Sequence, residues 1–366
     1  MPNTAEAPPA HPPQSPATDG HAIDAQRLSD WMAAHIPWFN GPLQVTRFKG
    51  GQSNPTYRLD TPTKVYVLRS KPGPVAKLLP SAHAIEREFR VMSALKSSAV
   101  PVAAMLGLCE DESVIGRAFY IMDHVPGRVF WEQSLPNVGR DDRRSIYLEM
   151  NRVLAELHLI NPQRVGLANF GKPGNYFERQ ISRWTKQYLS SVTDPIPEME
   201  QLIEWLPANI PDSAQATDRV SIVHGDYRLD NIMFDAASPH AAAVLDWELS
   251  TLGHPLADFS YHCMSWHIPP GVFRGLAGLD LGALNIPTEK EYIALYCERT
   301  RFITPEALEA DWGFYLAYNM FRLAAILQGI AKRVQAGTAS SAQALQSAAG
   351  ARPMAHSAWA MAQAQG

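Results

Sequence analysis

One short segment of the chain concentrates side chains that can accept a proton and hold a cation. The segment SIVHGDYRLDN follows an apolar run with His224, Asp226 and Asn231, and the later segment AVLDWE ends a second apolar run with Asp246. Carboxylate and amide oxygens suit a hard divalent cation, and a carboxylate can also act as a general base. These residue types therefore predict a cation site beside a proton acceptor.

The sequence between these groups predicts a hairpin that brings them together. In NIMFDAASPHAAAVLD, two apolar runs flank a turn that contains Pro, which is typical of two antiparallel strands. A turn centred on the Ser-Pro pair aligns Ile232 with Leu245. The same register aligns Asn231 with Asp246, and Asp226 lies only five residues before Asn231. We therefore expect Asp226, Asn231 and Asp246 to converge at one end of the hairpin.

The spacing of the His, Asp and Asn residues matches a known catalytic pattern. His-x-Asp followed by four residues and Asn is the catalytic-loop pattern of phosphoryl transfer, with a later Asp on the metal. In this interpretation Asp226 accepts the proton of a substrate hydroxyl, while Asn231 and Asp246 hold Mg²⁺. His224 packs to fix the loop, and Arg228 stabilises charge on the transferred phosphate. The alternative is a set of turn formers at strand ends, but the joint spacing favours phosphoryl transfer.

Two loops earlier in the chain are candidates for binding a nucleotide. The segment KGGQSNPTY joins two alternating apolar runs, and its glycines allow the backbone to approach phosphate oxygens closely. It contains neither GxGxxG nor GxxxxGK[ST], so a plain hairpin turn is the alternative. The segment FYIMDHVPG is suited to a hinge whose backbone hydrogen-bonds adenine. The phosphate candidates are Gly51, Ser53 and Asn54, and the hinge candidates are Asp123, His124 and Val125.

A cation and a carboxylate are expected to pair next to these loops. Strand alternation in KVYVLR places Val67 and Arg69 on one face, so Val67 could line the adenine near a cationic group. Lys71 has the same parity and is the alternative cation, although Pro72 indicates that the strand has ended. Glu88 lies at the flank of the apolar face of the following helix, and Arg69 is its expected partner. The alternative for Glu88 is an exposed helix carboxylate.

Apolar periodicity predicts an α+β fold with two lobes. Residues 23–124 form a small lobe in which an antiparallel sheet packs on one main amphipathic helix, and residues 125–340 form a larger, mostly helical lobe. Residues 1–22 are rich in Pro and are expected to be a disordered tail. Residues 341–366 are rich in Ala and are expected to be a loosely attached tail. The expected strands lie at 43–48, 56–60, 64–69, near 101–111 and near 118–125, and the expected helix lies at 81–96.

Composition argues against several classes of protein. A formal net charge of −4 provides no basic field that would attract nucleic acid. No apolar run approaches the roughly 20 residues that cross a bilayer, and the N-terminus lacks the pattern of a signal peptide. The three cysteines form no CxxC pair. We therefore expect a cytoplasmic protein that binds neither nucleic acid nor membrane.

These parts, in this order, resemble the aminoglycoside phosphotransferase family, which has a bilobal protein-kinase-like fold and includes choline and homoserine kinases. The resemblance covers roughly residues 43–334, and its specific strings include GGQSNPTYRLD, HGDYRLDNIMF and VLDWELSTLGHPLADFS. It implies ATP and Mg²⁺ as cofactors and a small-molecule hydroxyl as the acceptor. It also implies that Asp258 braces the catalytic loop. The family has Lys where this sequence has Arg69, and the two cations bind phosphate differently.

The resemblance is strongest to the kinase-like domain that is fused ahead of an acyl-CoA dehydrogenase in some animal proteins. It implies phosphorylation of a hydroxyacyl-CoA, with a separate acyl-CoA dehydrogenase chain as the partner that acts on the product. Residues 161–190 contain five Lys or Arg and one acidic residue, Glu178, which favours an anionic acceptor if this segment lines the acceptor site. The alternatives are a solvated helix face, an aminoglycoside or other amino-alcohol kinase, and a nucleotide-binding pseudokinase module without turnover.

Overall fold

The computed structural model describes residues 23–48, 54–72, 84–172, 174–215, 219–271, 274–339 and 342–365. Contacts divide the chain into unit 1, which contains the residues up to Val129 and Ile232–Glu248, and unit 2, which contains Phe130–Asn231 and the residues from Leu249 onward. All of 125–340 was predicted to belong to the helical lobe. The structure instead groups the hairpin with unit 1, because Phe234 exchanges two backbone hydrogen bonds with Arg128, at 2.7 and 2.8 Å.

Unit 1 is built on a five-stranded antiparallel sheet with the strand order β1-β2-β3-β5-β4. All five expected strands and the expected helix, which is α2, are confirmed. One further helix, α1, precedes the sheet. The elements are α1 (Ala25–His35), β1 (Gln44–Arg47), β2 (Thr56–Asp60), β3 (Val65–Ser70), α2 (Ile85–Leu95), β4 (Met105–Cys109) and β5 (Phe119–Asp123).

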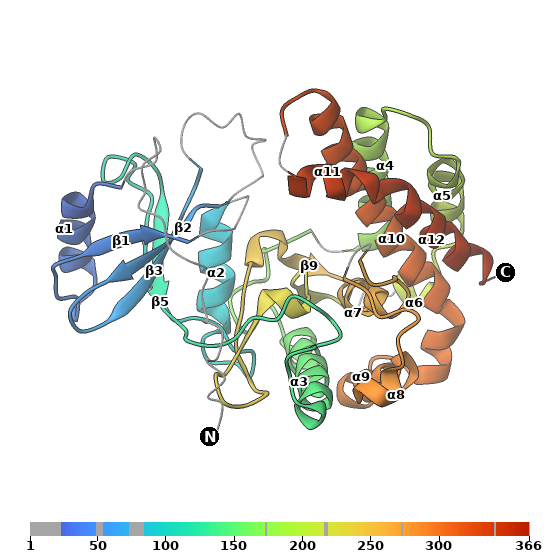
Figure 1. The fold of residues 1–366 in the computed structure, drawn as a ribbon, viewed down its shortest axis with the longest axis horizontal. Helices are drawn as coiled ribbons and strands as arrows, with labels where there is room; N and C mark the ends of the chain where they lie inside the picture. The colour runs from blue at the N-terminus through green and yellow to red at the C-terminus, as the bar shows by residue number, and fades with distance from the viewer. Residues whose placement is uncertain are drawn as a thin grey trace, which may run out of the picture. The chain divides into compact units, whose positions relative to one another are not determined.

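Helices α1 and α2 cover opposite faces of this sheet (Figure 1). On one face, Leu28 and Met32 of α1 belong to the same buried cluster as Tyr66 of β3. On the other face, Ile85 of α2 packs with Tyr120 of β5. Because Arg69 is the register partner of Tyr120, the predicted strand alternation brings Arg69 to the side of the sheet that α2 covers.

Helix α1 was not predicted from the sequence. Of its eleven residues only Leu28 and Met32 are buried, and Trp31 packs against the same core, so the few apolar residues of this short helix have helical spacing. The helix begins after Asp24, whose carboxylate accepts hydrogen bonds from the backbone N–H groups of Gln26 and Arg27 at 3.1 and 3.0 Å. An N-capping Asp before an apolar pair was therefore the available signal.

The hairpin of β7 (Ile232–Phe234) and β8 (Ala241–Val244) has a different register from the one predicted. Ile232 pairs with Val244 rather than Leu245, so the predicted alignment was wrong by one residue. The reason is an irregularity between Met233 and Phe234, which the expected regular hairpin with a turn centred on Ser238 and Pro239 did not allow for. Asp235 caps that turn by accepting hydrogen bonds from two following backbone N–H groups, at 2.9 and 3.0 Å.

Unit 2 is mostly helical, as expected. Its long central helix α10 packs against α4, α7 and α12. A two-stranded pair, β6 with β9, supports the loop that contains Asp226. None of the helices that the structure describes combines the length and the apolar character needed to cross a membrane. The elements are α3 (Arg140–Leu159), α4 (Tyr176–Ser191), α5 (Pro197–Ala208), α6 (Asp212–Gln215), β6 (Ser221–Val223), β9 (Thr251–Gly253), α7 (Pro255–Cys263), α8 (Leu281–Leu284), α9 (Glu289–Thr300), α10 (Pro305–Gln335), α11 (Ala342–Ala349) and α12 (Ala351–Gln363), with short 3-10 turns at Leu229–Asn231, Trp247–Leu249 and Met264–Trp266.

The Ala-rich C-terminal segment packs more tightly than predicted. A loosely attached tail was expected, but α12 packs against α10 and α5 and buries Met354, Ala355 and Ala358. Small side chains let the two helix backbones approach each other, and a Cβ added at Gly313 of α10 would lie 2.9 Å from the Met361 carbonyl oxygen. Ala in this segment therefore contributes close helix packing as well as helix propensity.

Candidate active site

The loop that contains Asp226 follows β6 directly and is sterically constrained. Gly225 has a φ of +82° and lies so close to Leu249 that an added Cβ would be 2.8 Å from its carbonyl oxygen. Only glycine meets both conditions without strain. His224 is fully buried, and its Nδ1 accepts a hydrogen bond from the Asp226 backbone N–H at 3.2 Å. This contact agrees with the packing role predicted for His224.

Asp258 of α7 holds the backbone of the same loop. Its carboxylate accepts hydrogen bonds from the backbone N–H groups of His224 and Gly225 at 2.6 and 2.9 Å, and His158 lies 3.4 Å away. Burial alone would raise the pKa of Asp258, but the hydrogen bonds and the nearby histidines outweigh it and lower the pKa. Asp258 therefore makes the contacts that a brace of this loop requires.

The Asp226 carboxylate is held on both of its oxygens. The Tyr261 hydroxyl donates to Oδ1 at 2.5 Å, and the Asn231 amide donates to Oδ2 at 3.0 Å. The Asn231 amide also donates to the Asp226 carbonyl oxygen at 2.8 Å, and Arg228 Nε lies 3.1 Å from Oδ1. The structure thus brings three of the predicted residues, Asp226, Arg228 and Asn231, into one network.

Two residues of this network were not anticipated from the sequence. Tyr261 comes from α7 and Arg322 from α10, and both are buried. Arg322 donates to the Gly225 carbonyl oxygen, and its guanidinium lies 4.9 Å from the centre of the Tyr261 ring. No local pattern marks Tyr261. For Arg322 the available signal was a charged residue inside the apolar stretch FYLAYNMFRLAAIL.

Arg228 is positioned by a second carboxylate. Asp230, which is almost fully buried, lies 3.3 Å from Arg228 Nη2 and also pairs with Arg274. Arg228, Arg274, Tyr261 and Gln133 line a small pocket of about 20 Å³ next to the Asp226 network. The polar lining of this pocket can receive a hydroxyl or phosphate oxygen.

In unit 1, the predicted ion pair between Arg69 and Glu88 is confirmed. Arg69 Nε lies 3.0 Å from Glu88 Oε2, and Glu88 is 1% exposed. Tyr120 and Asn54 complete the contacts of Glu88 by donating to it at 3.0 and 2.7 Å. Burial would lower the pKa of Arg69, but Glu88, followed by Tyr120 and Asp246, raises it. The guanidinium therefore stays charged inside unit 1.

Asp246 shares the same arginine. Its Oδ1 accepts a hydrogen bond from Arg69 Nη2 at 2.6 Å, and Glu248 lies 3.6 Å from that nitrogen. Asp246 follows β8 and has a φ of +62°, a conformation that Asp tolerates better than most residues. Lys71, the alternative cation, pairs with Glu86 instead.

Some of the predicted nucleotide contacts have other partners or lie outside the described residues. Asn54 was predicted to donate to phosphate, but it is buried and its amide positions Glu88. Gly51 and Ser53 lie outside the described residues. At the predicted hinge, the Asp123 backbone N–H donates to the Ala104 carbonyl oxygen at 2.9 Å, so it is not available to adenine. Adenine binding by Val67, His124 and Val125 stays a prediction.

The donor set predicted for Mg²⁺ is chemically suitable. Asn231 uses its amide nitrogen on Asp226, which leaves its carbonyl oxygen as the ligand, and Asp246 provides a carboxylate oxygen. Among the described residues, no group of three or more His, Cys, Asp or Glu could hold a metal ion. A cation bound by Asn231 and Asp246 would need further ligands, which nucleotide phosphates and water can provide. Because Asn231 belongs to unit 2 and Asp246 to unit 1, their convergence stays a prediction.

Replacement of Arg69 by Ala is expected to destabilise the protein by about 3–5 kcal/mol, because Glu88 would remain buried without its charged partner. Lys71→Ala is the matched control, since its pair with Glu86 is about one-third exposed and contributes about 0–1 kcal/mol. Denaturant unfolding of both variants measures the difference. Equal unfolding free energies for the two variants would contradict this account of the buried pair.

A sequence model of the phosphotransferase enzyme family matches residues 44–291 of the chain. Acyl-CoA dehydrogenase family member 10 from Mus musculus is 45% identical over 328 residues, which are 89% of this chain and 30% of that protein. Acyl-CoA dehydrogenase family member 11 from Homo sapiens is 39% identical over 328 residues, which are 88% of this chain and 41% of that protein. The chain therefore spans less than half the length of these curated relatives.

Solved structures with the same fold cover nearly the whole chain. A crystal structure of a "putative aminoglycoside phosphotransferase" from Ralstonia eutropha is 58% identical, with a TM-score of 0.86 over 94% of this chain and 99% of that chain. An aminoglycoside phosphotransferase in ternary complex with AMP-PNP and hygromycin B is 15% identical, with a TM-score of 0.59 over 88% of this chain and 95% of that chain. The sheet of unit 1, the helices of unit 2 and these neighbours define a kinase-like α+β fold. The chain belongs to the phosphotransferase enzyme family, which confirms the resemblance found in the sequence.

Proposed function

We propose that the chain transfers the terminal phosphate of ATP, with Mg²⁺, to the hydroxyl of a small molecule. The observation that carries this proposal is the fixed carboxylate of Asp226, held by Tyr261 and Asn231. The acceptor hydroxyl gives its proton to Asp226 while its oxygen bonds to phosphorus, and ADP leaves with the electrons of the broken bond. Catalysis then depends on positioning and on neutralisation of charge.

The nucleotide is assigned to the charged groups of unit 1. Arg69, which is held by Glu88 and Asp246, would provide a permanent positive charge for a phosphate oxygen. Asp246 and Asn231 would hold Mg²⁺, which neutralises charge on the phosphates when it is bound. Arg228, fixed by Asp230, would stabilise the transferred phosphate.

For the acceptor we propose a hydroxyacyl-CoA. Support comes from the names of the curated relatives, which are acyl-CoA dehydrogenase family members, and from the excess of basic residues in 161–190. An acyl-CoA dehydrogenase is the proposed consumer of the product, and the cytoplasm is the proposed compartment. Aminoglycosides and amino alcohols are polycationic or cationic, and this basic segment would repel them.

A screen of ADP release tests the function. Purified protein with ATP and Mg²⁺ is expected to release ADP with hydroxyacyl-CoAs and not with the matching acyl-CoAs that lack the hydroxyl. Aminoglycosides, choline and homoserine are screened beside them. ADP release with only an aminoglycoside or an amino alcohol would overturn the proposed acceptor. If none of the tested acceptors caused ADP release, the result would favour a nucleotide-binding module without turnover.

A further inference from the structure

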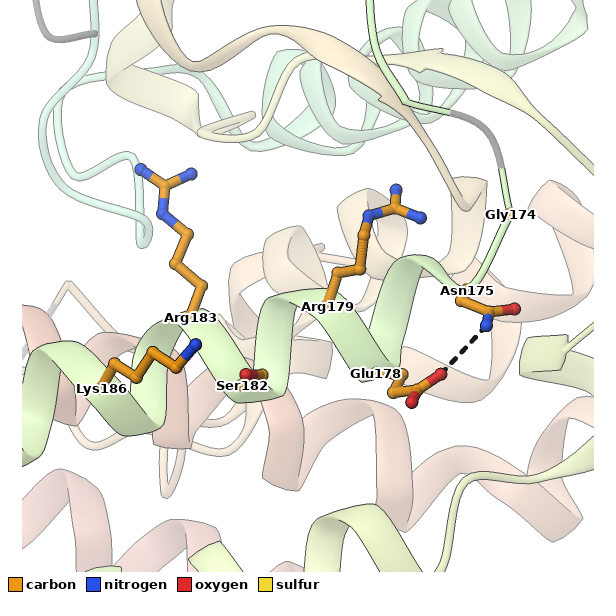
Figure 2. Close-up of a pocket in the computed structure, with 7 residues that line it drawn as sticks. All are labelled: Gly174, Asn175, Glu178, Arg179, Ser182, Arg183 and Lys186. Atoms are coloured by element: carbon orange, nitrogen blue, oxygen red, sulfur yellow. Dashed lines mark hydrogen bonds between the residues drawn. The ribbon is translucent and has the colours of Figure 1, made fainter. Parts of the chain in front are cut away.

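One face of α4 carries a concentration of positive charge that the catalytic network does not use. Arg179, Arg183 and Lys186, which we call the α4 basic face, line a surface pocket of about 900 Å³. Figure 2 shows the guanidinium groups of Arg179 and Arg183 on the same side of the helix. Glu178 lies in the same pocket but turns toward Asn175, whose amide donates to it at 3.0 Å.

This arrangement of like charges lowers the stability of α4 as an isolated helix. Arg179 and Arg183 are four residues apart, and like charges at that spacing destabilise a helix. Other side chains of α4 are apolar and buried, among them Phe177 and Trp184. Positive charge is therefore concentrated at a concave surface with little acidic compensation, which suits binding of a multiply charged anion.

A second, apolar pocket adjoins the first. It has a volume of about 250 Å³ and is lined by Ile181, Ile203 and Pro207, and it shares Glu178, Ser182 and Lys186 with the larger pocket. An inorganic anion has no apolar part that could fill this second pocket. A nucleotide has both parts, because its flat base is largely apolar and its phosphates are charged.

The α4 basic face is connected to the proposed catalytic base within unit 2. Trp184 of α4 lies next to Arg183, with a ring-to-cation distance of 5.2 Å, and next to Arg322, with a distance of 5.6 Å. Arg322 in turn donates to Gly225, the residue before Asp226. A ligand on this face is therefore connected, through Trp184 and Arg322, to the loop that contains the proposed catalytic base.

We propose that the α4 basic face binds the phosphates of a nucleotide moiety of the acceptor, and that the adjoining apolar pocket binds the base of that moiety. This inference rests on the proposed function and identifies the nucleotide moiety as that of coenzyme A, which carries three phosphates on one adenosine. Arg183 and Lys186 are exposed and contact the phosphates, and Arg179 is held beside them through its hydrogen bond to the Lys172 carbonyl oxygen at 2.8 Å.

Calorimetric titration with coenzyme A tests the site. Wild-type protein is expected to bind coenzyme A, and the double substitution Arg183→Glu with Lys186→Glu is expected to weaken binding by about 10- to 100-fold. Lys290→Glu on α9 is the matched control, because it reverses an exposed charge on another helix of unit 2 and should leave binding unchanged. Unchanged binding of AMP-PNP with Mg²⁺ shows that the double variant is folded.

Dephospho-coenzyme A, which lacks the 3′-phosphate, provides a second readout. Wild-type protein is expected to bind coenzyme A more tightly than dephospho-coenzyme A, and the double variant is expected to lose that preference. No binding of coenzyme A to wild-type protein, or equal binding by wild-type and double variant, would overturn the site. The proposed function fails separately, if Asp226→Asn keeps full ADP release while its binding of coenzyme A is normal.

Discussion

Replacement of Asp226 by Asn is expected to reduce kcat by about 10²- to 10⁴-fold, because the amide cannot accept the proton of the acceptor hydroxyl. The substitution preserves side-chain size, and Tyr261 can still donate to the remaining oxygen. The Asn231 amide loses its bond to the carboxylate but keeps its bond to the backbone carbonyl oxygen of residue 226. Binding of the Mg²⁺ nucleotide should be unchanged, since the effect lies on the chemical step. Steady-state ADP release measures kcat, and calorimetry with AMP-PNP measures nucleotide binding.

Tyr261→Phe provides a graded control for this result. It removes only the hydroxyl that donates to Asp226 and keeps the ring that Arg322 contacts. A loss of one hydrogen bond to a carboxylate of about 1.5–3 kcal/mol corresponds to a reduction in kcat of roughly 10- to 150-fold. If Asp226→Asn retained wild-type turnover, the assignment of the base would be wrong, whatever the result for Tyr261→Phe.

Replacement of Asp246 by Ala is expected to weaken Mg²⁺-dependent nucleotide binding by at least about 100-fold, because the predicted carboxylate ligand of the cation is lost. Binding of the nucleotide without Mg²⁺ should change little, since Arg69 keeps its partner Glu88. Calorimetric titration of AMP-PNP with and without Mg²⁺ measures both quantities.

A second substitution at Asp246 is needed because the backbone conformation there can itself affect folding of the Ala variant. Its φ of +62° is strained for Ala, whereas Asn adopts this conformation more readily. Asp246→Asn therefore removes the negative charge with less effect on folding. Glu248→Gln is the matched control, because Glu248 also lies near Arg69 but is not a predicted ligand. Equal Mg²⁺ dependence in Asp246→Ala and in wild-type protein would remove Asp246 from the metal site.

Local sequence rules were sufficient for most elements of unit 1. The five strands follow from two-residue alternation, and α2 follows from its apolar period, because both patterns arise from backbone geometry over a few residues. The same rules placed Arg69 and Glu88 on facing surfaces, so their ion pair could be predicted. They failed for the hairpin register, where one irregular position after Met233 shifts the strand pairing by one residue.

The sequence by itself determined which groups are available for chemistry: the spacing of His224, Asp226 and Asn231 is a property of the chain before it folds. Only the tertiary structure decided what holds those groups in place. Tyr261 and Arg322 lie 35 and 97 residues along the chain from their hydrogen-bond partners Asp226 and Gly225. The physical reason is that periodicity and turn preferences act over a few residues, whereas contacts at such separations depend on how α7 and α10 pack.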